Sequence, residues 1–228
     1  MYFDVYYLIL VVPALIFSMW AQSRVTSTFN RYSQQRTYSG MTGYEAARRI
    51  LQANGLYHVQ VERVSGNLTD HYDPKANVIR LSDSVFGSNS VAAVGVAAHE
   101  AGHAVQYAKH YAPIKLRTAI IPVTQIGSQL SIPLVLIGFL MGAQGLVNLG
   151  LMLFATVAVF QLVTLPVEFD ASGRAVKALE MGGTVSDEEL KGVKKVLSAA
   201  AMTYVAALAV SVANLLRLVL RFGGRNRD

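Results

Sequence analysis

Ala97-Ala98-His99-Glu100-Ala101-Gly102-His103 lies in an apolar stretch that predicts a buried helix over about residues 90–107. Because a helix turns once in about 3.6 residues, His99 and His103 share one face and can bind a single metal ion. Glu100 can then act as a base toward water that the metal activates, without being a ligand. The alternative is a buried structural helix whose histidines only hydrogen-bond to neighbouring groups.

A tetrahedral metal site needs a further protein ligand, and the sequence favours a carboxylate. The last of the five histidines is His110, so the region beyond it offers only Asp and Glu. Pro166 is predicted to begin a helix over 166–181, with Glu168 in its first turn. Glu168 is therefore the first candidate for the third ligand of Zn²⁺, and Asp170 is the second. Glu168 alone would be read as an acid that stabilises a helix N-terminus.

These segments resemble the YugP-like family of bacterial membrane zinc metallopeptidases. The resemblance rests on residues 99–106 and 168–172, with further likeness at 68–74 and 78–82. The chain is also similar, more distantly, to HtpX-like and CAAX prenyl proteases. The resemblance implies that His99, His103 and Glu168 bind zinc and that Glu100 is catalytic. Ser172 stands where the distant relatives carry an aspartate that orients a ligand histidine, so the residues supporting the ligands must differ here.

The composition indicates a membrane protein rather than a soluble or nucleic-acid-binding one. Of the 228 residues, 53% are hydrophobic, and the mean hydropathy of +0.37 is high for a soluble domain. The net charge is +6, but the basic residues are scattered and many flank apolar segments, which favours contact with anionic lipid and argues against nucleic acid. The chain has no cysteine, which excludes disulfides and thiolate metal sites.

Four apolar segments are each long enough to span a bilayer. They cover about residues 2–21, 119–141, 146–165 and 196–220, and the first reads as an uncleaved anchor followed by a polar connector at 22–38. The two middle segments form a hairpin that returns Glu168 to the side of the histidines. We therefore expect a mainly α, multi-pass integral membrane protein with one membrane-embedded metallopeptidase domain over 1–228.

Residues 57–81 predict a small antiparallel β-sheet upstream of the metal helix, because apolar residues there alternate with polar ones. An extended protein or peptide substrate could add to its edge as a further strand. Within it, the segment 70–74 contains His71 and two aspartates. We interpret this segment as a turn or substrate loop rather than a second metal site.

Charge predicts a cell-membrane location with the catalytic face in the cytoplasm. An N-terminus outside the cell places most basic residues next to the spans on the inner side, as the positive-inside rule requires. Only the basic C-terminus, with Arg221, Arg225 and Arg227, opposes this orientation. Nothing in the sequence indicates the oligomeric state.

The sequence thus predicts a zinc metalloendopeptidase that hydrolyses peptide bonds of membrane-associated or unfolded proteins, with Glu100 as general base. Three residues are open candidates for stabilising the oxyanion: Tyr72, Tyr204 and Arg217. Two alternatives remain, a zinc-dependent hydrolase of lipids or other amides, and a noncatalytic metal-binding membrane scaffold. Glu100 argues against the scaffold, because a structural site gains little from a carboxylate that is not a ligand.

Overall fold

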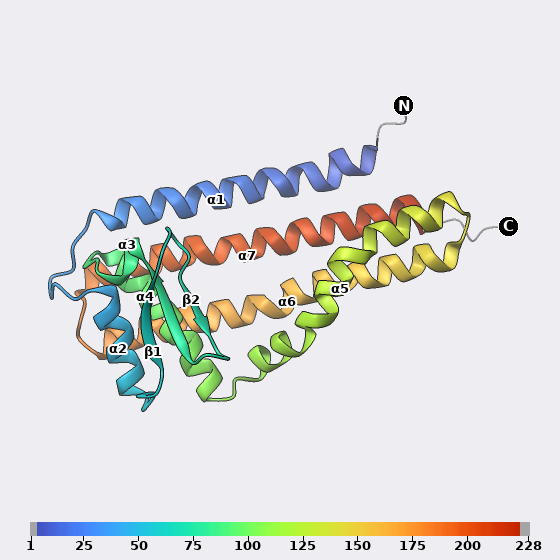
Figure 1. Ribbon diagram of the computed structural model, residues 1–228. Helices are drawn as coiled ribbons and strands as arrows, with labels where there is room; N and C mark the ends of the chain where they lie inside the picture. Colours follow the sequence, from blue (N-terminus) through green and yellow to red (C-terminus); the bar gives the residue numbers. More distant parts are fainter. Residues whose placement is uncertain (1–3, 224–228) are drawn as a thin grey trace. The chain divides into compact units, whose positions relative to one another are not determined.

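The computed structural model describes residues 4–223, which are mainly helical (Figure 1). A π-helical turn, η1 (Tyr7–Val11), leads into α1 (Val12–Ser33). The other helices are α2 (Gly43–Ala53), α3 (Asp83–Phe86), α4 (Val91–Ala108), α5 (Ala112–Leu140), α6 (Gln144–Met181) and α7 (Asp187–Phe222). The strands β1 (Gln60–Val64), β2 (His71–Asp73) and β3 (Val78–Ser82) form one sheet. The predicted mainly α fold class is confirmed.

Four helical segments are long and apolar enough to cross a membrane, as predicted. They are Tyr7–Ser33, Ala112–Leu140, Gln144–Met181 and Asp187–Phe222, and each overlaps one predicted span. Because α1 continues to Ser33, most of the polar connector predicted at 22–38 is helical. The first two residues of the 2–21 span, and Arg225 and Arg227, lie outside the described residues.

The prediction that Pro166 begins a separate helix is wrong, because α6 runs through it without a break. Proline removes one backbone donor and crowds the preceding turn, which usually ends or kinks a helix. In membrane-spanning helices it is better tolerated, because neighbouring groups can satisfy the carbonyl that it leaves without a partner. The same holds for Pro122 and Pro133 inside α5. Glu168 therefore lies in the middle of a helix and not in its first turn.

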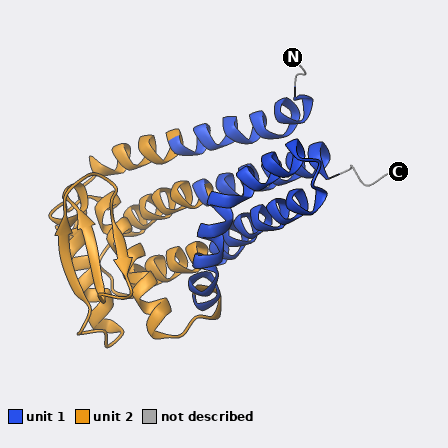
Figure 2. Ribbon diagram, turned by 45° about the vertical axis from the view of Figure 1, so that its right-hand side comes forward, with its two compact units in different colours: residues 1–22, 115–166, 203–228 blue, residues 23–114, 167–202 orange. Residues whose placement is uncertain are grey.

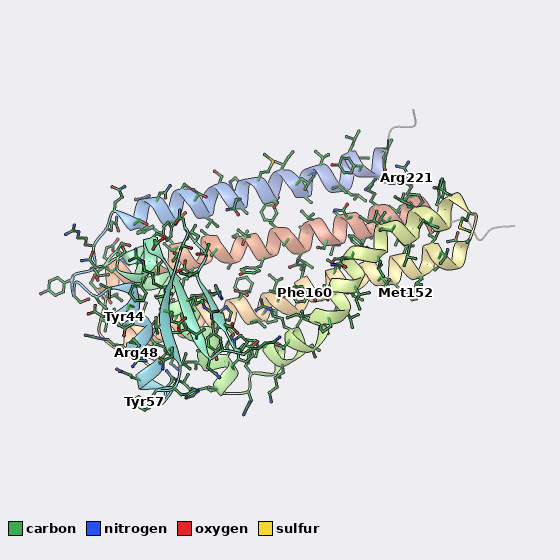
Figure 3. The ribbon with its side chains drawn as sticks, viewed as in Figure 1. Tyr44, Arg48, Tyr57, Met152, Phe160 and Arg221 are labelled. Carbon is green, nitrogen blue, oxygen red and sulfur yellow. The ribbon has the colours of Figure 1, made fainter. Side chains whose placement is uncertain are left out.

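The chain divides into two compact units (Figure 2). Unit 1 contains residues 1–22, 115–166 and 203–228. In it, α5 and α6 are joined by a short turn at Gly142, whose φ of +68° favours glycine. A Cβ at Gly150 would lie 2.7 Å from the carbonyl oxygen of Ser131, so small residues let the two helices approach closely. Met152, labelled in Figure 3, is 64% exposed, as expected for a side chain that faces lipid.

Unit 2 contains residues 23–114 and 167–202 and has a core of its own. Fully buried side chains from α2, β3 and α4, among them Leu51, Ile79 and Val94, meet in this core. Arg48, labelled on α2 in Figure 3, donates a hydrogen bond to the carbonyl of Val59 at 3.3 Å and ties α2 to the segment before β1. The hydrophobic face of α2 is thus fixed against the sheet and α4.

The sheet is mixed, so the prediction of an antiparallel sheet is wrong in part. Its strand order is β1-β3-β2, with β1 parallel and β2 antiparallel to the central strand β3. The sequence reading missed β2, which has only three residues and is followed by a turn at 74–77. The chain reverses direction once between β1 and β2 and again between β2 and β3, so β3 runs in the same direction as β1. Segment 70–74 is thus part strand and part turn.

Capping residues begin two helices of unit 2 at the predicted positions. Thr42 accepts from the Glu45 N–H, while the Glu45 carboxylate accepts from the Thr42 N–H at 2.8 Å. Ser186 and Glu189 make the same reciprocal pair before α7. Each pair satisfies two donors that the helix itself leaves unused.

Candidate metal centre

Helix α4 places His99 and His103 on one face, as their spacing predicts. Its N-terminus is capped by Ser90, whose side chain accepts from the Ala93 N–H at 3.2 Å. Most of its residues are buried and many are Ala or Gly, so neighbouring helices can approach closely. At Gly102 the approach is so close that only glycine fits, because a Cβ there would lie 2.6 Å from the carbonyl oxygen of Ala171 on α6.

This helix contact brings Glu168 of α6 to the two histidines. Its Oε2 lies 3.3 Å from Nε2 of His99 and 3.5 Å from Nε2 of His103. One ligand atom from each of the three residues lies within 4.8 Å of the others, so the group could hold a metal ion. The structure therefore brings together the three residues that the sequence singled out as ligands.

The spacing of these atoms suits zinc. Zinc binds histidine nitrogen and carboxylate oxygen at about 2.0–2.1 Å, and tetrahedral ligands at that radius lie roughly 3.3 Å from one another. The two nitrogen–oxygen separations match this value. A donor set of two imidazoles and one carboxylate also leaves a fourth position for water or substrate.

Burial makes the group costly without a cation. Glu168 is 2% exposed and His103 is 9% exposed. Burial alone would lower the pKa of His103, but the neighbouring carboxylates of Glu168 and Glu100 reverse this and raise it. Two acids next to an imidazole in a buried place are what a divalent cation would stabilise.

Glu100 is also buried, although it is not one of the three grouped residues. It follows His99 on α4, so it points about 100° away from that histidine around the helix. Asp70, just before β2, lies near enough to Glu100 for the negative charge of Glu100 to affect the pKa of Asp70. Burial raises the pKa of Asp70, and the negative charge of Glu100 adds to this effect, while hydrogen bonds from Ser82 oppose it.

The other ring nitrogen of each histidine has a partner in the protein. Nδ1 of His99 lies 3.1 Å from Oγ of Ser172. The position where distant relatives carry an aspartate thus holds a hydroxyl that contacts one of the two grouped histidines. Nδ1 of His103 lies 3.0 Å from Oε1 of Gln106. The sequence reading did not identify Gln106, although a buried amide one helical turn after His103 on an apolar helix was a usable signal.

Asp170, the second candidate for the third ligand, does not belong to the group. Its Oδ2 accepts hydrogen bonds from Nε2 of Gln106 at 2.7 Å and from Nε of Arg174 at 2.5 Å. Asp170 and Arg174 line a cavity of about 830 Å³, whose wall also contains Gly102, Arg49 and Lys177. Asp170 is therefore connected to His103 through an intervening amide.

The candidates for oxyanion stabilisation have different environments. Tyr72 lies on β2 in unit 2, where burial raises its pKa and its hydroxyl donates to Asn77 at 3.3 Å. Arg217 lies in unit 1, and its Nε donates to Asp4 at 2.8 Å. Tyr204 is also in unit 1. His71 is exposed, and its Nδ1 lies 2.8 Å from the carbonyl of Thr69.

Comparisons with known proteins agree with these features. The model of a protein family described as "Putative neutral zinc metallopeptidase" matches residues 7–223. The chain is 48% identical over 223 residues to "Putative membrane protease YugP" of Bacillus subtilis (strain 168), and the match covers 97% of this chain and 99% of that protein. No solved structure matches.

Proposed function

Because the chain belongs to the family described as "Putative neutral zinc metallopeptidase", we propose that it is an integral membrane zinc metalloendopeptidase. One observation carries the proposal. Nε2 of His99 and Nε2 of His103 lie 3.3 and 3.5 Å from the same oxygen of Glu168, and Glu100 follows His99 on the same helix. His99, His103 and Glu168 would hold Zn²⁺, and Glu100 would be the catalytic base.

Each protein group has a separate task in this mechanism. When bound, zinc would polarise the scissile carbonyl and activate water for attack. Glu100 accepts a proton from the attacking water as the C–O bond forms, and in the following step gives that proton to the leaving nitrogen as the C–N bond breaks. Of the three oxyanion candidates, Tyr72 lies in the same unit as the proposed ligands, and its hydroxyl is a hydrogen-bond donor.

We place the substrate along β2. In the described sheet β2 pairs only with β3, so it is an edge strand. An extended segment of protein can add to such an edge by main-chain hydrogen bonds, which recognise an unfolded chain without requiring a particular sequence. The substrates are therefore unfolded or membrane-associated proteins. By the positive-inside rule, cleavage takes place on the cytoplasmic side of the cell membrane.

The test compares the wild type with E100Q in detergent, using an unfolded protein and a lipid amide as separate substrates. We expect cleavage of the protein only, loss of cleavage with a chelator, and recovery when Zn²⁺ is returned. E100Q should retain zinc but cleave at least about 10²-fold more slowly, since general-base catalysis is typically worth that much or more.

E180Q is the matched control, because Glu180 is an exposed carboxylate on α6. It should cleave at the wild-type rate. Full activity of E100Q would refute the role of Glu100. Cleavage of the lipid amide but not of the protein would support a zinc-dependent amide hydrolase instead, and zinc binding without any cleavage would support a scaffold.

A further inference from the structure

Gln106 is an unusual residue for its position. It is 0% exposed, although it is polar and lies on the mostly apolar helix α4. A buried amide is destabilising unless its donors and acceptor are satisfied. Its hydrogen bonds therefore need an explanation, and they lead directly to a proposed ligand.

The amide of Gln106 is held at both ends. Its nitrogen, Nε2, donates to the carbonyl oxygen of Val167 at 2.8 Å and to Oδ2 of Asp170 at 2.7 Å. Its oxygen, Oε1, faces Nδ1 of His103 at 3.0 Å. Turning the amide over would set Oε1 against two acceptors, so Val167 and Asp170 fix its orientation.

This orientation determines which nitrogen of His103 carries the proton. Because Oε1 can only accept, Nδ1 of a neutral His103 must be the donor. The lone pair is then on Nε2, the atom that lies 3.5 Å from Glu168. Neutral imidazole with a free Nε2 is the form that binds zinc. In neutral His103 the hydrogen-bond chain thus favours the tautomer whose Nε2 can bind a metal.

Asp170 supplies the fixed end of this chain. Its Oδ2 is itself bound by Nε of Arg174, one helical turn further along α6. We propose that Gln106 and Asp170 are positioning residues that set the tautomer and ring orientation of His103 for zinc binding. This inference rests on the proposed function, because it takes His103 to be a zinc ligand.

The first test measures zinc affinity by competition with a chelating dye, in the wild type and in Q106L. Removing such a partner of a ligand histidine typically weakens metal binding about 10–100-fold, and we expect a loss in this range. K177Q is the matched control, since Lys177 lies on α6 in the wall of the same cavity as Asp170. It should keep the wild-type affinity.

The second measurement needs neither zinc nor activity. ¹⁵N NMR of histidine-labelled, metal-free protein reports which ring nitrogen is protonated. At a pH where the imidazole is neutral, His103 should be protonated on Nδ1 in the wild type and should be a mixture of tautomers in Q106L. A purely structural role for Gln106 would lower thermal stability but would leave the tautomer and the zinc affinity of the folded fraction unchanged.

A pair of exchanges tests whether Asp170 acts through Gln106. In Q106E the new carboxylate would face Asp170 and the carbonyl of Val167, all of them acceptors. Adding D170N supplies a donor to that carboxylate. We therefore expect D170N to weaken zinc binding in the wild type and to strengthen it in the Q106E background.

The outcomes separate this inference from the proposed function. Wild-type zinc affinity and tautomer in Q106L, or a D170N effect of the same sign in both backgrounds, would overturn the positioning role even if peptide cleavage is observed. Tight, Gln106-dependent zinc binding in a protein that cleaves no peptide would support the positioning role and refute the peptidase.

Discussion

At the scale of single residues, one oxygen of Glu168 lies within 3.5 Å of two imidazole nitrogens. The next acid on the helix, Asp170, instead binds Gln106 and Arg174. Two carboxylates that are close in sequence therefore have different surroundings, and their removal should have different consequences.

Zinc content distinguishes these two acids. E168A removes a proposed ligand, so it should contain little zinc after purification and dialysis against a metal-free buffer. D170A removes the acceptor shared by Gln106 and Arg174 but no proposed ligand, so it should still reach about one zinc per chain at saturating metal, with weaker affinity. Elemental analysis at defined free zinc measures both. Full zinc occupancy in E168A at low free zinc would show that Glu168 is not the ligand.

Asp70 provides a prediction for pH. Because its pKa is raised in the folded protein from the ordinary value of 3.8, the folded state holds this proton more tightly than the unfolded chain does. The contribution of Asp70 to stability therefore falls as pH rises from about 3.8 through the raised pKa. D70N cannot lose the proton, so the unfolding temperature of the wild type should fall relative to that of D70N over this interval.

Thermal unfolding of the metal-free protein between pH 4 and 7 measures the difference. The comparison of the two proteins at each pH cancels the other groups that titrate. Parallel curves for wild type and D70N would mean that Asp70 has the same pKa in the folded and unfolded chains.

At the scale of elements, the site depends on how closely α4 and the 167–181 part of α6 approach. Gly102 is in contact with the backbone of Ala171, and a Cβ there would lie 2.6 Å from a carbonyl oxygen. A backbone oxygen cannot turn aside as a flexible side chain can. The two helices can therefore approach this closely only because Gly102 has no side chain. The distance from Glu168 to the histidines depends on the same approach.

G102A should force the helices apart. We expect a loss of about 1–3 kcal/mol in unfolding free energy, the usual cost of overpacking, together with at least tenfold weaker zinc binding because Glu168 moves away. G173A is the control, because a Cβ at exposed Gly173 on α6 meets nothing within 4 Å. It should stabilise the protein by roughly 0.5–1 kcal/mol, the usual gain for Gly to Ala inside a helix. Denaturant unfolding and zinc titration of both variants check this, and equal effects would contradict the close-contact argument.

At the scale of the whole molecule, the four candidate spans divide the chain among the two sides of a membrane. With four spans, the proposed orientation, in which the N-terminus is outside, predicts that segments 34–111 and 182–186 are in the cytoplasm and that the 141–143 turn is outside. Because the chain has no cysteine, single introduced cysteines give unique labels for this arrangement.

Three variants at exposed positions test the topology: Y38C, M141C and M181C. A membrane-impermeant maleimide added to intact cells should label only M141C, and the other two should react after lysis. The wild type should not react at all. Labelling of Y38C and M181C in intact cells would place the catalytic face outside, and equal labelling of all three would contradict the α5–α6 hairpin.

The sequence predicted well the features that depend on local spacing or on length. Four spans follow from apolar runs, and the shared face of His99 and His103 follows from the helical period. The capping pairs at Thr42 and Ser186 are also local patterns. The helix break at Pro166 was wrongly predicted, because the rule comes from helices in water. The direction of β1 was wrong because β2 is too short to recognise.

By itself, then, the sequence determined that this is a multi-pass helical protein with two histidines presented together on a buried helix. Only the tertiary structure decided which groups meet them. Glu168 and Asp170 are two positions apart on a helix, so they point about 200° apart around its axis. Which of them faces His99 and His103 depends on how α6 packs against α4 at Gly102. The same packing brings Gln106 to Asp170, because contacts between helices far apart in the chain are set by the shapes of both surfaces and not by spacing along either one.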